Sequence, residues 1–237
     1  MLSNYCKSWI AVAAVLAIAT SCSYTEDPGS LREDKREFAV MDFDRLEMGS
    51  GFIIDVEQSS SFEVEARGDQ RNLDDLEVFV SGNTLTARFR NNANRNHSTR
   101  IEVKMPALKS INFSGGTKSK IEDFESDQQL DVFLSGAALC EVKVGYRKVK
   151  VVLSGASKLD IEGLGDEMNA EVSGASVLIA FDYPVRAADV NVSGASFGKV
   201  TVSDDLAAVA SGASRLLYRG SPTVSSDVSG ASSVQKD

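Results

Sequence analysis

The sequence predicts an all-β fold, a parallel β-helix whose coils each take 18–21 residues. Two observations carry the prediction. The tetrapeptide Ser-Gly-Ala-Ser recurs at a near-constant spacing, and apolar residues alternate with variable ones on both sides of it. A solenoid explains both, because every stacked coil repeats the same buried positions. We expect a right-handed coil, as in typical β-helices.

The repeated tetrapeptide marks one point in each coil. Successive copies are separated by 21, 19, 19, 20, 18 and 18 residues. Two relaxed copies precede five complete ones, and the copies begin at Ser114, Ser135, Ser154, Ser173, Ser193, Ser211 and Ser229. We expect each copy to form a corner. Gly would supply backbone freedom there, Ala would be small enough to sit inside, and stacked serine hydroxyls would bond one another.

Alternating apolar positions flank each corner. The residue just before the first Ser is apolar in all seven copies, and the residue three before it is apolar in six. Beyond the corner, the two apolar columns hold Cys140, Leu159, Leu178 and Leu216, and then Ile121, Val142, Ile161, Ala180 and Val200. A period of two predicts strands with one buried face. Cys140 is therefore expected to be a core residue rather than a reactive thiol.

The first 37 residues are typical of an export signal followed by a linker. Residues 1–21 carry one charge, Lys7, and an apolar run over 10–19 that is too short to span a bilayer. Ala-Thr-Ser then leads into Cys22, as in the lipobox of bacterial lipoproteins. We predict a signal peptide over 1–21 and lipidation of Cys22, with ordinary secretion as the alternative. The polar, charged residues 22–37 predict a flexible tether.

The composition excludes several classes of function. With 25 Lys+Arg against 34 Asp+Glu, the formal charge is −9, which argues against a nucleic-acid partner. One His and three Cys leave little for a transition-metal site or a Cys/His catalytic pair, so we expect no metal and no cofactor. Signal cleavage and lipidation would leave Cys140 alone, so no internal disulfide is expected.

The N-terminal half adds motifs that resemble a known family. Gly49–Gln58, Phe62–Gly68, Asn72–Leu85 and Ile101–Ile111 precede the Ser-Gly-Ala-Ser coils in this order. The combination resembles the family called putative auto-transporter adhesin, head GIN domain, over residues 38–237. The resemblance implies a β-helix-like fold on exported proteins and lipoproteins, mostly of Bacteroidetes, and it transfers no catalytic residues.

The domain boundaries follow from these motifs. We expect one domain over residues 38–237, with a less regular lobe over 38–107 and the repeat coils over 108–237. The polar stretch 91–100, which contains His97, departs from the family pattern and predicts an exposed loop.

Two outward surfaces are candidates for function. Glu141, Lys143, Asp160 and Glu162 would lie on neighbouring coils, as the acids and base of a polysaccharide-active enzyme do. Alternating charges are equally what a solvated sheet face shows.

The second surface is apolar and is the candidate partner surface. It comprises Val177, Ile179, Phe181, Phe197 and Leu217. The alternative is that residues 182–187 fold over these side chains and make them a minor core.

The expected function is that of a non-catalytic cell-envelope lipoprotein, an adhesin that binds an extracellular glycan or protein. Its lipid would anchor it in the outer membrane. Acidic residues after Cys22 resemble the export signal of surface lipoproteins, while a periplasmic orientation stays open. A polysaccharide-active enzyme and a structural envelope scaffold are the alternatives.

Overall fold

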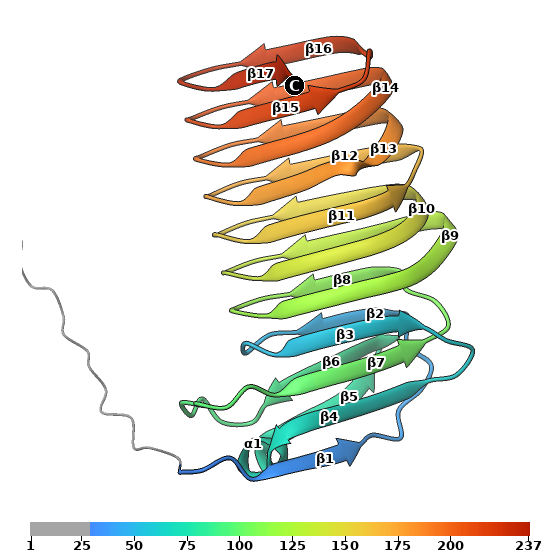
Figure 1. Cartoon of the computed structure of the whole chain (residues 1–237), viewed down its shortest axis with the longest axis vertical. Helices are drawn as coiled ribbons and strands as arrows, with labels where there is room; N and C mark the ends of the chain where they lie inside the picture. Colours follow the sequence, from blue (N-terminus) through green and yellow to red (C-terminus); the bar gives the residue numbers. More distant parts are fainter. Residues whose placement is uncertain (1–28) are drawn as a thin grey trace, which may run out of the picture.

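The computed structural model describes residues 29–237 and consists of a parallel β-solenoid above a less regular N-terminal lobe (Figure 1). The solenoid has about seven turns of roughly 19 residues. The predicted fold class is therefore confirmed. The predicted signal peptide and Cys22 lie outside the described residues. No helix within residues 29–237 is long and apolar enough to cross a membrane.

Each turn of the solenoid runs along one wall, turns at a corner and returns along the other wall. Its strands are β8 (Ser110–Phe113), β9 (Lys118–Leu134), β10 (Leu139–Leu153), β11 (Lys158–Leu164), β12 (Glu167–Val172), β13 (Val177–Val192), β14 (Phe197–Ala210), β15 (Arg215–Arg219), β16 (Thr223–Val228) and β17 (Ser233–Lys236). The longer strands bend between their two halves and so contribute to both walls. We call the wall of segments that follow the corners the post-corner wall, and the other the pre-corner wall. Neighbouring segments within each wall pair in parallel.

The N-terminal lobe continues both walls but changes their strand directions. Its elements are β1 (Glu33–Glu37), β2 (Arg45–Met48), β3 (Ile53–Gln58), β4 (Glu63–Asp69), α1 (Gln70–Asp75), β5 (Leu76–Ser81), β6 (Thr84–Phe89) and β7 (Arg100–Met105). β2 lies between β6 and β8, and β3 lies between β7 and β9, all in parallel. β1, β4 and β7 pair antiparallel, as do β5 and β6. The predicted less regular lobe is therefore present, and residues 91–99 form the predicted loop.

The predicted flexible tether is wrong for its last five residues. Glu33–Glu37 form β1, which pairs with β4 from Glu33 opposite Asp69 to Glu37 opposite Glu65. Lys35 also forms an ion pair with Glu65 at 3.0 Å. A run of charged residues resembles a solvated linker, but here Lys35 reaches its diagonal neighbour Glu65 on β4 while the backbone joins the sheet. The folded body thus begins before residue 38.

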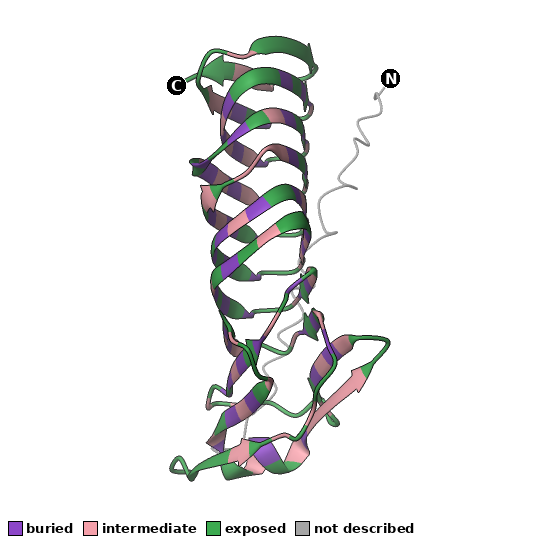
Figure 2. Cartoon of the chain, turned by 90° about the vertical axis from the view of Figure 1, so that its right-hand side faces the viewer, coloured by how far each residue is buried: buried purple, intermediate pink, exposed green. Residues whose placement is uncertain are grey.

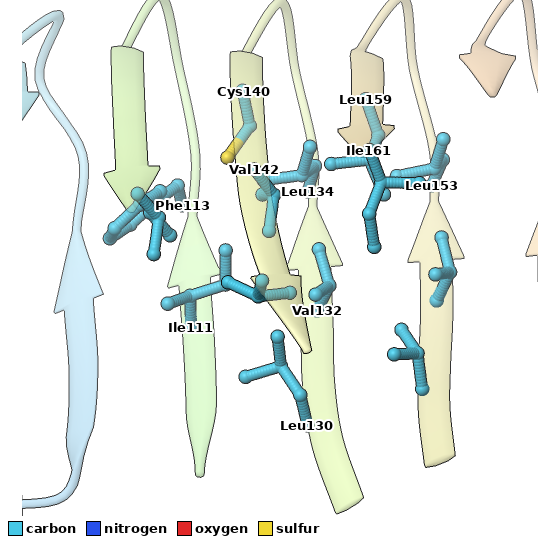
Figure 3. Close-up of a cluster of buried hydrophobic side chains, with 14 of the residues drawn as sticks. Ile111, Phe113, Leu130, Val132, Leu134, Cys140, Val142, Leu153, Leu159 and Ile161 are labelled. Atoms are coloured by element: carbon cyan, nitrogen blue, oxygen red, sulfur yellow. The ribbon is translucent and has the colours of Figure 1, made fainter. Parts of the chain in front are cut away.

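The interior holds the apolar columns that the alternation predicted. Figure 2 shows buried and exposed residues alternating along the strands of both walls. Side chains from the two walls meet inside, with Ile111, Phe113, Val132 and Leu134 from one wall and Cys140, Val142, Leu159 and Ile161 from the other (Figure 3). Burial raises the pKa of the Cys140 thiol to about 12, which keeps it protonated and unreactive at neutral pH.

The corners have the predicted backbone, but their side chains are arranged differently from the prediction. The corner glycines have φ between 70° and 79°, and each Ala N–H donates to the Gly carbonyl of the preceding coil at 2.7 Å. The Ala side chains are exposed, whereas the last serines, Ser157, Ser176, Ser196 and Ser214, are buried. The expectation that Ala sits inside the corner is therefore wrong. The last Ser shares the parity of the inward strand positions that follow it, so its side chain points inward and Ala points outward.

The buried serine hydroxyls form part of the expected ladder. The Ser157 and Ser176 Oγ atoms lie 3.3 Å apart, and those of Ser214 and Ser232 also lie 3.3 Å apart. The Ser196 hydroxyl instead donates to the Ser193 carbonyl at 2.6 Å. Each hydroxyl thus has a partner inside an otherwise apolar interior, as buried polar groups require.

Candidate functional site

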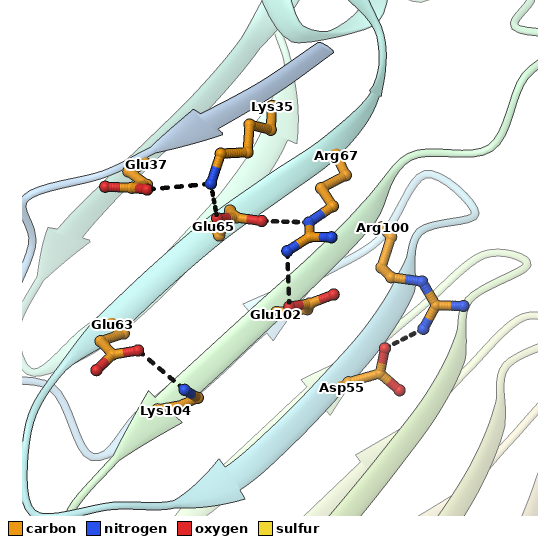
Figure 4. Close-up of polar contacts among 9 residues, drawn as sticks. All are labelled: Lys35, Glu37, Asp55, Glu63, Glu65, Arg67, Arg100, Glu102 and Lys104. Atoms are coloured by element: carbon orange, nitrogen blue, oxygen red, sulfur yellow. Dashed lines mark hydrogen bonds and ion pairs between the residues drawn. The ribbon is translucent and has the colours of Figure 1, made fainter. Parts of the chain in front are cut away.

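The N-terminal part of the post-corner wall has charges that compensate one another. Outward residues on β1, β4, β7 and β3 form ion pairs across the strands (Figure 4). The Arg67 guanidinium donates a hydrogen bond to Glu65 and lowers the pKa of that carboxyl, and Glu63 raises the pKa of Lys104. These pairs are solvent-exposed and contribute little stability each. They leave this region with few unpaired charges to offer a ligand.

The four candidate catalytic residues lie together in the middle of the same wall. Glu141 is opposite Asp160, and Lys143 is opposite Glu162, on the adjacent strands β10 and β11. With Lys120 and Glu122 they line a shallow hollow of about 320 Å³. Glu141, Lys143 and Glu162 are exposed, and Asp160 is half-buried and lies 3.7 Å from Lys158.

The hollow lacks the shielding that glycosidase-type chemistry uses. A general acid needs a carboxyl group held away from water, so that its neutral form persists. Here the acids line an open surface and share it with lysines. The arrangement brings the predicted residues together as an open, mixed-charge sheet face.

The candidate partner surface lies further along the wall, on β13, β14 and β15. Val177 is opposite Phe197, and Lys199 lies between Ile179 and Leu217. All five predicted side chains, Val177, Ile179, Phe181, Phe197 and Leu217, face outward and are half-buried. The structure therefore places them on one surface.

Cations rather than a chain segment cover the rings of this surface. The Arg219 Cζ atom lies 3.8 Å from the centroid of the Phe181 ring. Lys199 Nζ lies 5.3 Å from the same centroid and 5.5 Å from that of Phe197. These are cation–π distances. We call these residues, together with Arg215 opposite Phe197, the aromatic–cation patch: Val177, Ile179, Phe181, Phe197, Lys199, Arg215, Leu217 and Arg219.

The alternative, in which residues 182–187 fold over the apolar side chains, does not hold. These residues continue β13, and Tyr183 and Val185 turn into the interior. They form the wall of the solenoid and leave its outer face uncovered.

The sequence analysis did not include the cations Lys199, Arg215 and Arg219 in this surface. Lys199 and Arg219 occupy the same outward columns as the apolar residues, so the alternation could have placed them there. Their contact with the phenyl rings depends on long side chains reaching across strands, which a column alignment does not express.

A metal site is the remaining candidate. Among residues 29–237, no group of three or more His, Cys, Asp or Glu could hold a metal ion. His97 lies in the loop over 91–99, where its Nε2 is 3.2 Å from the Gly29 carbonyl oxygen.

These features define a parallel β-solenoid with an open aromatic and cationic outer surface. The chain belongs to the family described as putative auto-transporter adhesin, head GIN domain, whose sequence profile matches residues 42–222. Comparison with curated proteins found no match.

Several solved structures share the fold. A putative adhesin from Bacteroides fragilis has a TM-score of 0.80 at 20% identity, over 88% of this chain and 98% of that one. A protein described as a putative lipid binding protein from Parabacteroides distasonis has a TM-score of 0.72 at 19% identity, over 86% and 96%. A putative adhesin from Parabacteroides merdae has a TM-score of 0.68 at 17% identity, over 87% and 96%. At these identities the likeness establishes the fold.

Proposed function

We propose that this protein is a non-catalytic, extracellular ligand-binding lipoprotein, an adhesin anchored in the outer membrane through Cys22. The observation that carries the proposal is the aromatic–cation patch. It combines half-buried apolar side chains with cations on an open sheet face, a composition suited to binding a partner. Family membership and relatives described as adhesins support the same function.

The position of the patch fits such a role. β1 and α1 lie at the N-terminal end of the molecule, whereas β13–β15 lie towards the other end (Figure 1). An anchor attached through the N-terminus would hold the patch away from the cell's own membrane. The solenoid would then act as a spacer that presents its distal outer face.

The direct test is a binding screen with an enzymatic readout. The purified protein is incubated with host and microbial glycans and with matrix proteins, and both retention and released sugar are measured. We expect retention without product. Released unsaturated or reducing sugar would contradict the proposal and make Glu141, Lys143, Asp160 and Glu162 the residues to replace. If the protein is not retained and no sugar is released, the result would favour a structural scaffold.

Replacing both phenyl rings should remove the binding. We expect Phe181→Ser with Phe197→Ser to weaken retention about tenfold or more, because aromatic side chains supply much of the energy of such surfaces. The matched control is Phe79→Ser with Phe133→Ser, two half-buried rings of the pre-corner wall. If both double variants bind equally well, the patch is not the binding surface.

The lipid anchor has its own test. The wild-type protein, expressed in a Bacteroidetes host, should incorporate labelled palmitate and partition into detergent, and Cys22→Ser should do neither. A water-soluble, unlabelled wild-type protein would favour ordinary secretion. Protease treatment of intact cells then determines orientation: digestion indicates surface exposure, and full protection would contradict it.

A further inference from the structure

Three cations cluster at the distal end of the post-corner wall. Lys199 on β14 is opposite Leu217 on β15, while Phe197 is opposite Arg215 and Thr201 is opposite Arg219. Lys199 is therefore the diagonal neighbour of both arginines. Diagonal neighbours on adjacent strands have Cα atoms about 8 Å apart, within reach of long side chains.

Protein carboxylates only partly compensate this cluster. Arg219 forms an ion pair with Asp237 at 2.8 Å. Within the described chain, Lys199 and Arg215 have no ion-pair partner. The outward positions of the post-corner segments over residues 177–181, 197–201 and 215–219 hold no carboxylate. On the neighbouring strand β11, the outward acids are Asp160, which is opposite Ile179, and Glu162.

The arrangement differs from the N-terminal part of the wall. Around β1, β4, β7 and β3, cations such as Lys35, Arg67 and Lys104 each lie beside an acid (Figure 4). A chain with a formal charge of −9 has ample acids to place beside Lys199 and Arg215 as well. Like charges close together on a sheet are destabilising, so the cluster has a cost that a bound anion would remove.

We propose that the aromatic–cation patch binds a linear acidic polysaccharide. Its carboxylate or sulfate groups would lie between Lys199, Arg215 and Arg219, and the C–H faces of its sugars would pack on Phe197 and on the part of Phe181 that Arg219 leaves exposed. This inference rests on the proposed function, for which it names the ligand class. The ligand supplies the negative charge that protein carboxylates provide around β1, β4, β7 and β3.

The shape of the patch favours a polymer over a membrane. Membrane-surface binding requires apolar side chains that protrude into the headgroup region. Here Val177, Ile179 and Phe181 are half-buried in the face of a sheet, and none of the five apolar patch residues is exposed. Three cations alone contribute only about 1 kcal/mol each at an anionic membrane. A flat, stacked surface instead allows an extended chain to lie across several coils.

The test compares the binding of charged and uncharged polysaccharides. Binding of the protein to polygalacturonate and to its fully methyl-esterified form is measured by calorimetry, with heparin as a sulfated polymer and dextran as a neutral one. We expect an acidic polymer to bind about tenfold or more tightly than the ester or dextran, and binding to weaken as salt is raised. Heparin carries sulfates beside its carboxylates, so tighter binding to heparin than to polygalacturonate would indicate that sulfate contributes.

Charge-removing variants assign the binding to the cluster. Lys199→Gln with Arg215→Gln should weaken binding of the acidic polymer about tenfold or more. Lys118→Gln with Lys150→Gln removes the same charge from unpaired lysines outside the patch and should change binding less than about twofold.

Each other outcome overturns the inference. Equal binding of acid and ester, equal loss in both double variants, or preferential binding to phosphatidylglycerol vesicles would do so. If a neutral glycan or a protein is retained through Phe181 and Phe197 while acidic polymers are not, the inference fails and the proposed function stands. If the protein binds nothing in either experiment, both fail.

Discussion

Replacing Gly174 with Ala should lower the free energy of unfolding by about 3 kcal/mol or more. Gly174 has φ +76°, and a Cβ atom there would lie 2.5 Å from the carbonyl oxygen of Gly155 on the preceding coil. That oxygen also accepts the Ala175 N–H at 2.7 Å. The left-handed backbone alone costs a non-Gly residue about 1–2 kcal/mol, and displacing the hydrogen-bonded corner adds to this.

Two other glycines separate the contributions. Gly82 has φ +56° with nothing within 4 Å of its added Cβ, so Gly82→Ala should cost only the backbone term, about 1 kcal/mol. Gly116 has neither a positive φ nor a neighbour within 4 Å, and Gly116→Ala should be close to neutral. Urea unfolding followed by circular dichroism gives all three values. If Gly174→Ala costs no more than Gly82→Ala, contact between stacked corners is not what requires glycine.

The sequence predicted the solenoid because each coil repeats the same physical demands. A period of two fixes which residues face inward, and the positions of Phe113, Leu134 and Leu153 are buried as the alternation indicated. The expectation that Ala sits inside the corner is wrong because it rested on residue size alone. Extending the strand parity through the corner would have placed Ser157 inside and Ala156 outside.

The interleaved N-terminal lobe could not be predicted from periodicity. β2 and β3 pair with β8 and β9 across roughly sixty residues of chain, while β4 to β7 form the layers beneath them. One local signal was present. Gly49-Ser-Gly51 joins two alternating segments, and Gly51 has φ +73°, close to the values of the repeat corners. Such a turn indicates a further coil, but not which strand it stacks on, since that depends on backbone pairing between distant segments.

The candidate site was predicted in its apolar part alone. Alternation places Val177 and Phe197 on the outer face without the structure. Two features make this face suited to an anionic ligand. Lys199 and Arg219 lie over the phenyl rings, and the outward positions of residues 177–181, 197–201 and 215–219 hold no acid. That contrast becomes visible only beside the compensated charges of β1, β4, β7 and β3, which belong to a part of the fold that the repeat does not describe.

Replacing Tyr183 with Phe should lower the free energy of unfolding by about 2 kcal/mol at neutral pH. The variant should also lose less of its stability than the wild type as the pH becomes alkaline. The buried Tyr183 hydroxyl donates to the Tyr146 carbonyl at 2.7 Å and lies 3.4 Å from the Tyr146 N–H, which donates to it. Removing the hydroxyl leaves both backbone groups buried without this partner, which accounts for the expected cost.

The alkaline effect follows from the same burial. Burial raises the pKa of the Tyr183 phenol to about 12, whereas an unfolded tyrosine titrates near 10. The folded state thus holds this proton more tightly. The contribution of the protonated phenol to the free energy of unfolding is complete below about pH 10. It is lost as the pH rises towards 12, by at most about 1.4 kcal/mol per pH unit. Tyr183→Phe should therefore show a shallower decline of the free energy of unfolding between pH 10 and 12.

Tyr218→Phe is the matched control for this experiment. Tyr218 is half-buried on β15, so loss of its hydroxyl should change stability by less than about 0.5 kcal/mol, and the variant keeps the Tyr183 phenol, so its alkaline slope serves as the reference. Tyr146, whose hydroxyl donates to the Leu108 carbonyl at 2.6 Å, also has a raised pKa and supplies a second alkaline-sensitive group in each variant. Some decline should therefore persist in Tyr183→Phe. Identical slopes in Tyr183→Phe and wild type would mean that the Tyr183 phenol holds its proton equally in the folded and unfolded states, which would contradict the effect expected from its burial.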